Sequence, residues 1–392
     1  MTQQEQIARN PRLLFWARAF IEIKAMTAII VLFYLHRGVE LHEVFWLSIV
    51  WSLTALLTEI PSGYLADRIG RKKTMLLGAA LLALMYVGEW FAHGFWQFAM
   101  VFVLMSSAFS CFSGTEEAML YESLLALGRE KEMTHKNGQL FSARSVFKTF
   151  VPFMGAMFAS SLLEWQFKTL IVVNALALLV AVICIVRLRE PQHRKDILEG
   201  EIGIFRESIE TMMQEPWLIR VALNKVLVFI AVFLAWRVYQ PLLNGQGMGV
   251  EWLGVFDMLT HMLIFVGAWF LGKCDKQWGT KRIIVVTALI TMATLVFAGY
   301  TTTPWMSFVL LLITIGVGSA REPIFAHMVN ERVCSRSRAT TLSNLNVIKS
   351  IFDIPVLLLA GWLASQSITF PLYLGAVLCL IAIMIFPYER TT

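Results

Sequence analysis

The sequence predicts an all-α polytopic membrane protein with twelve transmembrane helices in two six-helix halves. Of its 392 residues, 57% are apolar and only 15% are charged, whereas soluble domains average about 45–50% and about 25%. The apolar residues gather in recurring blocks of about 18 residues or more, long enough to cross a hydrocarbon core of about 30 Å. Because lipid offers the backbone no hydrogen-bond partners, such blocks must form helices.

Taken in order, the apolar blocks define the predicted spans and the division of the chain. The spans are residues 13–36, 43–64, 73–93, 95–125, 139–162, 166–188, 216–241, 250–272, 282–302, 304–328, 340–364 and 367–388. We therefore predict an N-terminal half at 1–188, a cytoplasmic linker at 189–215 and a C-terminal half at 216–392. Within the linker, helical apolar spacing over 202–213 favours an amphipathic helix. A merely solvated linker is the alternative.

The lysines and arginines outside the spans predict the orientation. They lie in the N-terminus, in the loops after even-numbered spans and at the C-terminus, while the opposite loops offer only Arg37 and Lys168. Positive loops stay on the cytoplasmic face, so we expect both termini to be cytoplasmic, in a cytoplasmic (inner) membrane. The net charge of +6 is then an orientation signal and not a nucleic-acid surface, because the bases form no single patch. The five cysteines lack CxxC spacing and imply neither a disulfide nor a metal site.

Many charged residues fall inside the predicted spans. Each costs about 2.5–3.5 kcal/mol on insertion scales, so together they must line a watery cavity or pair across helices. The residues that we assign to a substrate cavity are Arg18, Glu22, Arg144, Lys148, Arg237, Asp257, Glu322, Lys349 and Asp353. Pairing as a buried salt bridge is the alternative for any one of them. A bundle that needed only stability would use apolar residues instead.

Glu116 and Glu117 in the fourth span are the candidate proton-coupling groups. Two adjacent carboxylates in a low dielectric repel each other and lose solvation, which favours proton binding by one of them. A coupling group must load and unload its proton near neutral pH. Arg144 on the next span is a candidate counter-charge. The alternative places both glutamates at the cytoplasmic end of the span, solvated and inert.

The segment between the second and third spans carries a family resemblance. It reads Gly63-Tyr64-Leu65-Ala66-Asp67-Arg68-Ile69-Gly70-Arg71-Lys72-Lys73, which we take as a tight turn with one acid and four bases. The spacing G-x-x-x-D-R-x-G-R-K/R resembles the loop signature of the major facilitator superfamily of secondary transporters. The resemblance implies that Gly63, Asp67, Arg68, Gly70 and Arg71 form a conformational latch between the halves. A purely topological role for the bases is the alternative.

Two further segments resemble parts of bacterial exporters in that superfamily. Ser113–Leu124 resembles the fourth span of small-molecule permeases, and Val151–Ala156 keeps the proline and one glycine of a Gly-Pro-x-x-Gly-Gly signature in the fifth span. The resemblance implies a monomeric carrier that exports a small organic molecule by proton exchange, with the proton motive force and no cofactor. The alternatives are transport of an anionic metabolite, such as a carboxylate siderophore, and a non-transporting sensor or scaffold. The sequence contains no HExxH, GxSxG or Walker-type motif, so we expect no enzyme.

Overall fold

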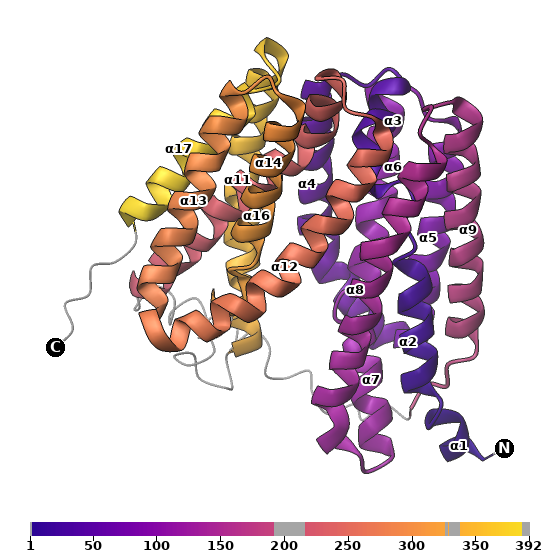
Figure 1. Ribbon diagram of the computed structural model, residues 1–392. Helices are drawn as coiled ribbons and strands as arrows, with labels where there is room; N and C mark the ends of the chain where they lie inside the picture. Colours follow the sequence, from indigo (N-terminus) through magenta and orange to yellow (C-terminus); the bar gives the residue numbers. More distant parts are fainter. Residues whose placement is uncertain (1, 192–215, 326–327, 329–337, 386–392) are drawn as a thin grey trace. The chain divides into compact units, whose positions relative to one another are not determined.

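The computed structural model describes residues 2–191, 216–325, 328 and 338–385, with side chains except at 141, 143–144, 216–218, 276 and 338–351. The described chain is helical and contains no strand (Figure 1). Its elements are α1 (Gln3–Ile7), α2 (Asn10–Ile21), η1 (Thr27–Ile29), α3 (Ile30–His36), α4 (Leu41–Ile69), α5 (Arg71–Phe91), α6 (Gly94–Phe112), α7 (Thr115–Ala126), η2 (Glu130–Glu132), α8 (Met133–Phe158), α9 (Glu164–Val186), α11 (Pro216–Gly245), α12 (Val250–Trp278), α13 (Thr280–Tyr300), α14 (Pro304–Ser319), α16 (Arg338–Gln366) and α17 (Phe370–Ile385). Each predicted span corresponds to one of these helices, or to two or three consecutive ones.

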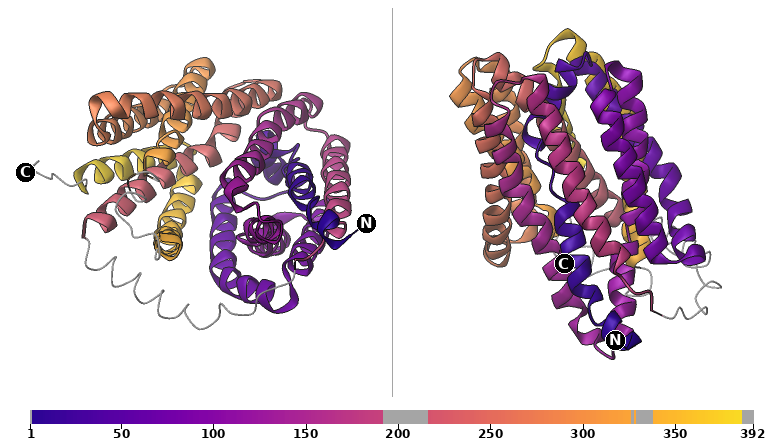
Figure 2. Two further views of the ribbon diagram at one scale, coloured as in Figure 1. Left: turned by 90° about the horizontal axis from the view of Figure 1, so that it is seen from below. Right: turned by 90° about the vertical axis from the view of Figure 1, so that its right-hand side faces the viewer.

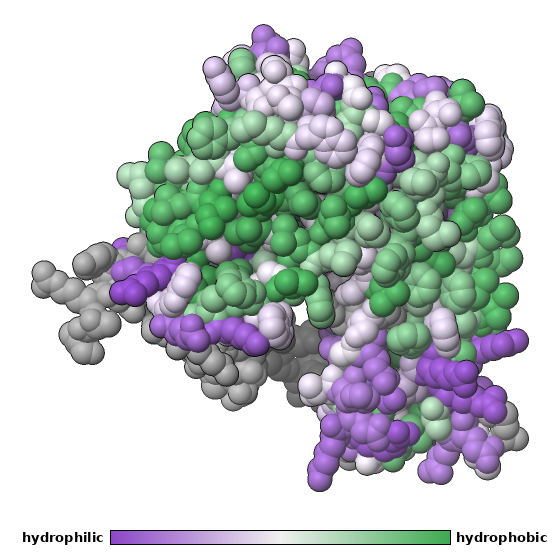
Figure 3. All heavy atoms as spheres, viewed as in Figure 1, coloured by the Kyte–Doolittle hydropathy of each residue, from purple (hydrophilic) through white to green (hydrophobic). Residues whose placement is uncertain are grey.

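The helices carry the surface of a membrane protein. Eight described helical stretches are long and apolar enough to cross a membrane, and three shorter ones are also apolar. Large hydrophobic side chains are exposed along them, among them Ile60 at 81%, Trp96 at 80% and Tyr300 at 83%. Figure 3 shows a broad hydrophobic band over the helices, with hydrophilic side chains gathered at the lower end of α7 and α1. Apolar surface on this scale needs a lipid environment, so the protein is multi-pass.

The chain forms two compact units. The first comprises Met1–Arg194 and Gly249–Met258, and the second comprises Lys195–Met248 and Leu259–Thr392. In the first unit α6 packs on α4 and α5, and α9 packs on α2 and α5; Figure 2 shows this bundle roughly along its helices in the left view. In the second unit α17 and α14 each pack on α11 and α13. The linker helix predicted within 189–215 lies outside the described residues and stays a prediction.

Three predicted spans are broken in the structure. Span 13–36 is interrupted between Ile21 and Thr27, and span 95–125 is interrupted at Ser113 and Gly114, where Gly114 has a φ of 69°. Span 304–328 is interrupted after Ser319, where α14 ends. Irregular backbone at membrane depth is tolerated only where other groups satisfy it. In the first break the Ala25 N–H donates to the Asn174 side chain at 2.9 Å.

The predicted turn over 63–73 is much shorter than expected. Helix α4 continues to Ile69 and α5 begins at Arg71, so only Gly70 separates them, with a φ of 100° that favours glycine. Helix α4 persists through Pro61. There the Ser62 hydroxyl donates to the Glu59 and Ser110 carbonyls, both at 2.9 Å, and anchors this part of α4 to α6.

Candidate functional site

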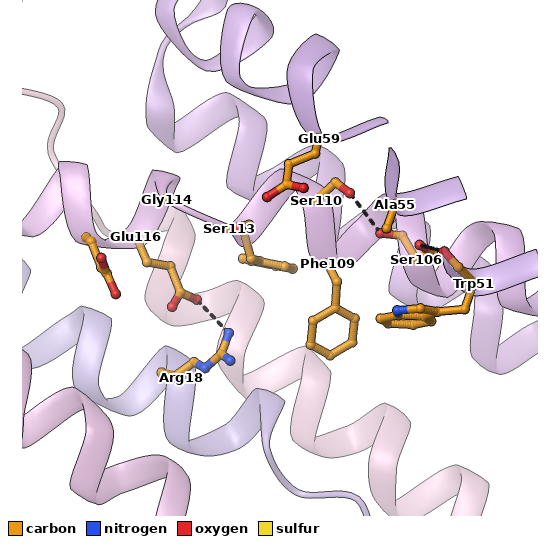
Figure 4. Close-up of a pocket in the computed structure, with 12 residues that line it drawn as sticks. Arg18, Trp51, Ala55, Glu59, Ser106, Phe109, Ser110, Ser113, Gly114 and Glu116 are labelled. Carbon is orange, nitrogen blue, oxygen red and sulfur yellow. Dashed lines mark hydrogen bonds and ion pairs between the residues drawn. The ribbon is translucent and has the colours of Figure 1, made fainter. Parts of the chain in front are cut away.

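A cavity of about 290 Å³ lies within the first unit (Figure 4). Helices α2, α4 and α6, the break after Phe112, and the start of α7 all contribute to its wall. The break matters because it ends α6 and restarts the helix at Thr115, which places Glu116 and Glu117 in the first turn of α7. The lining residues are Arg18, Trp51, Ala55, Glu59, Ser106, Phe109, Ser110, Phe112, Ser113, Gly114, Glu116 and Glu117.

Arg18 is shared between two buried carboxylates at this wall. Its Nη2 lies 2.7 Å from Glu22 Oε1, and its Nη1 donates to Glu116 Oε1 at 3.3 Å. Figure 4 shows the Arg18 and Glu116 side chains pointing toward each other. Arg18 is 8% exposed, Glu22 2% and Glu116 3%. Charges this deeply buried are stable only when paired, so the three groups depend on one another.

Two lysines extend this cluster around Glu22. Lys24 Nζ lies 3.9 Å and Lys148 Nζ 4.0 Å from Glu22 Oε2. The Lys24 ammonium also lies over the Phe109 ring, 4.4 Å from its centroid, and Phe109 lines the cavity. Glu22 is therefore within 4.0 Å of three bases, Arg18, Lys24 and Lys148.

Glu89 on α5 is a further buried acid that our sequence analysis did not single out. It is 5% exposed, and its Oε2 atom has no hydrogen-bond partner among the described residues. Its charge interacts with that of Lys24. Glu89 could have been identified from the sequence, because it is the sole acid within the predicted span 73–93.

The structure treats the two predicted coupling groups differently. Glu116 is buried against Arg18, whereas Glu117 is exposed at the cavity wall. Arg18 is a counter-charge of Glu116 among the described side chains. The side chain of Arg144, which we expected in this role, lies outside the described residues, so that pairing stays a prediction. Lys148 reaches the cluster with a side chain that is 50% exposed.

The remaining predicted cavity residues fall in both units. Asp257 is fully buried on the part of α12 that belongs to the first unit, and its charge interacts with that of Lys148. In the second unit, the Arg237 guanidinium lies over the Phe233 ring at 4.7 Å, and Asp353 is 6% exposed. Glu322 is 58% exposed and is paired with a lysine. The side chain of Lys349 lies outside the described residues.

The predicted latch residues divide into exposed and anchored groups. Asp67 and Arg68 are exposed on the last turns of α4, and nothing lies within 4 Å of a Cβ built at Gly63. Arg71 is anchored: its Nη2 lies 2.7 Å from Glu122 Oε1 on α7, and its backbone N–H donates to the Glu190 carboxylate.

Gly70 is close-packed where Gly63 is not. A Cβ at Gly70 would lie 2.7 Å from the Glu190 carboxylate oxygens. Glu122 and Glu190 therefore tie the start of α5 to α7 and to the segment after α9. Neither residue was among our predicted site residues.

Among the described residues, no three or more His, Cys, Asp or Glu side chains are placed to hold a metal ion.

One comparison with known proteins identifies a family, and others show the fold. The family model described as Major Facilitator Superfamily matches residues 14–352. A bacterial homologue of the human lysosomal transporter Spinster, inward-facing and unoccupied, is 16% identical with a TM-score of 0.74, covering 98% of this chain and 96% of its own. A mutant of the nucleoside transporter NupG is 10% identical with a TM-score of 0.79, covering 98% and 99%. A bacterial homologue of the iron transporter ferroportin, inward-facing, is 13% identical with a TM-score of 0.72, covering 97% and 98%. At these identities the similarity shows the fold alone. No curated protein sequence matches the chain.

Proposed function

Because this chain belongs to the major facilitator superfamily, we propose that it is a proton-coupled secondary transporter that exports a small organic molecule across the cytoplasmic membrane. The family and the fold support a multi-pass membrane transporter. The proposal adds proton coupling, outward direction, alternating access, a monomeric state and cytoplasmic termini. The proton motive force replaces any cofactor as the energy source.

The observation that supports proton coupling is the position of Arg18 between two acids. Arg18 contacts both Glu22 and Glu116, and all three side chains are buried beside the cavity. Protonation of Glu116 would remove its charge and leave the guanidinium to Glu22 or to a ligand in the cavity. Loss of that proton would restore the pair. A buried charge without a partner is strongly unfavourable, so occupancy of the cavity and protonation of Glu116 are expected to depend on each other.

The contacts of Arg71 support the proposed latch. Glu122 and Glu190 hold this arginine at the start of α5, while Asp67 and Arg68 keep their charges exposed for a partner that changes during the transport cycle. A role in topology alone would not need the Arg71 guanidinium to be paired with Glu122.

The alternative of a sealed sensor or scaffold is less favoured. If the residues around the cavity served stability alone, well-packed apolar side chains would do so as well or better. Polar and charged residues line the cavity instead. The cavity beside Arg18 and Glu116 therefore supports transport.

The test is flux of a compound panel in proteoliposomes, with and without an imposed pH gradient. We expect the gradient to drive flux of at least one compound, and Glu116→Gln to reduce the gradient-driven flux at least tenfold, about 1.4 kcal/mol in barrier height. The matched control is Glu130→Gln, because Glu130 is exposed in η2 and should leave flux unchanged. Flux that ignores the gradient, or that survives Glu116→Gln at full gradient dependence, would refute proton coupling through this cluster.

A further inference from the structure

The second unit contains its own cavity, of about 460 Å³. Helix α11 forms one wall, and the end of α14 with the short segment that follows it forms another. Most of the lining is apolar, including Phe229, Val232 and Phe325. The charged residues at the wall are Lys225, Arg321 and Glu322. The proposed coupling cluster does not involve this cavity.

Arg321 is the unusual group in this cavity. It is 2% exposed, and its Nη2 donates to Asn224 Oδ1 at 2.8 Å and to the Ile284 carbonyl at 3.2 Å. Its Nε atom has no acceptor, and the part of the chain that the structure describes forms no ion pair with Arg321. The guanidinium lies over the Phe325 ring at 5.1 Å. A buried cation held only by neutral groups is costly in a membrane protein, and such a cost is typical of a functional site.

The first unit shows what Arg321 lacks. Arg321 and Glu322 follow the end of α14, just as Glu116 and Glu117 follow the end of α6. In both pairs the first residue is buried and the second is exposed. In the first unit the buried residue is an acid that meets an arginine, whereas here it is an arginine that meets the amide of Asn224. Among the residues of the second unit that the structure describes, Arg321 is therefore the base of such a pair without a carboxylate partner.

We propose that this cavity binds an organic carboxylate with an apolar body, and that Arg321 holds the carboxylate of the ligand. Arginine matches carboxylates in geometry and charge, and the apolar walls fit an aromatic or aliphatic body. The volume lies within the range of about 300–1,000 Å³ typical of small-molecule sites. Lys225 Nζ lies 2.6 Å from Glu322 Oε1, so these two charges at the wall balance each other and Arg321 supplies the positive charge for the ligand. The claim that this anion is also the transported molecule rests on the proposed function. The claim that it binds in this cavity does not.

The test measures equilibrium binding to the purified full-length protein in a non-ionic detergent. The probes are 2-naphthoate and its neutral counterpart 2-naphthamide, titrated by calorimetry. We expect the acid to bind at least about tenfold more tightly than the amide, since a hydrogen bond to a charged group contributes enough for that ratio. Arg321→Gln should remove this preference, whereas Arg282→Gln, which changes an exposed arginine on α13, should preserve it.

A second variant keeps the proposal testable if the Arg321→Gln protein does not fold. Ser319→Phe fills the cavity that Ser319 lines while leaving Arg321 in place, and it should weaken naphthoate binding at least about tenfold by occlusion. Equal affinity for acid and amide in the wild type, or wild-type affinity for naphthoate in a folded Arg321→Gln or Ser319→Phe protein, would overturn the proposal. Because these assays need no membrane potential or pH gradient, they separate failure of this site from failure of proton coupling.

Discussion

Gly155 on α8 lies close to the backbone at Ala25. A Cβ built at this position would overlap the Ala25 carbonyl oxygen and lie 2.7 Å from the Ala25 carbonyl carbon. Non-bonded carbons attract at about 3.5–4.0 Å, so the two backbones would have to separate by about 0.8 Å or more. Ala25 cannot retreat easily, because its N–H is bound by the Asn174 side chain. We therefore expect Gly155→Ala to be strongly destabilising.

The magnitude follows from two opposing effects. Replacement of a helical glycine by alanine stabilises a helix by about 0.5–1 kcal/mol, and overpacking of a tight contact costs about 1–3 kcal/mol or more. The net loss for Gly155→Ala should be about 1–2 kcal/mol or larger, measured as the free energy of unfolding or the Tm in detergent.

The control for Gly155→Ala is Gly138→Ala in the same helix, where nothing lies within 4 Å of the new Cβ. That variant should be as stable as the wild type or more so. If both substitutions shifted the Tm equally, the close approach of α8 to Ala25 would not determine the need for glycine, and the reasoning would be refuted.

Two further predictions concern ion pairs in the first unit. Arg37 is 3% exposed, and it donates to Glu164 at 2.6 and 3.1 Å and to the Ala92 carbonyl at 2.9 Å. Because Arg37→Met removes these bonds, it should lower the free energy of unfolding by about 2–4 kcal/mol. Lys168→Met, which removes an exposed partner of the same glutamate, should cost less than about 1 kcal/mol, and equal losses would contradict a structural role for Arg37. For Glu122, a double-mutant cycle with Arg71 should give a coupling energy of about 0.5–3 kcal/mol; a value of zero would show that the ion pair contributes nothing to stability.

The positions of the spans were predictable from composition, but the breaks within them were not. Hydropathy averages over many residues, so it places the apolar blocks without detecting a few non-helical residues inside one. The first break depends on Asn174, far along the chain, whose side chain satisfies the Ala25 N–H. The error over 63–73 has a similar origin. The charged residues suggested a loop, but exposed charges at the end of a helix are compatible with helical structure. Only Gly70 lies outside the two helices.

The residues of the candidate site were partly predictable. The cost of a charge in lipid singled out Arg18, Glu22 and Glu116, and the structure brings all three together. The same argument could not state which partner each residue would choose, and the expected pairing of Glu116 with Arg144 stays a prediction. Partner choice depends on how the helices rotate and pack, which hydropathy does not report. Glu122 and Glu190, which anchor Arg71, were missed for this reason.

The sequence by itself determined that this chain is a helical membrane protein and where its spans lie. The reason is that an apolar block long enough to cross the hydrocarbon core is recognisable from its length and composition. The family resemblance came from the motif over 63–73 and from two further segments, and the family match over residues 14–352 confirmed it. Only the tertiary structure decided that Arg18 is shared between two acids, that Gly155 faces a backbone, and that Arg321 is held by neutral groups. Each of these facts depends on residues distant in sequence meeting across helices, and packing alone sets those distances.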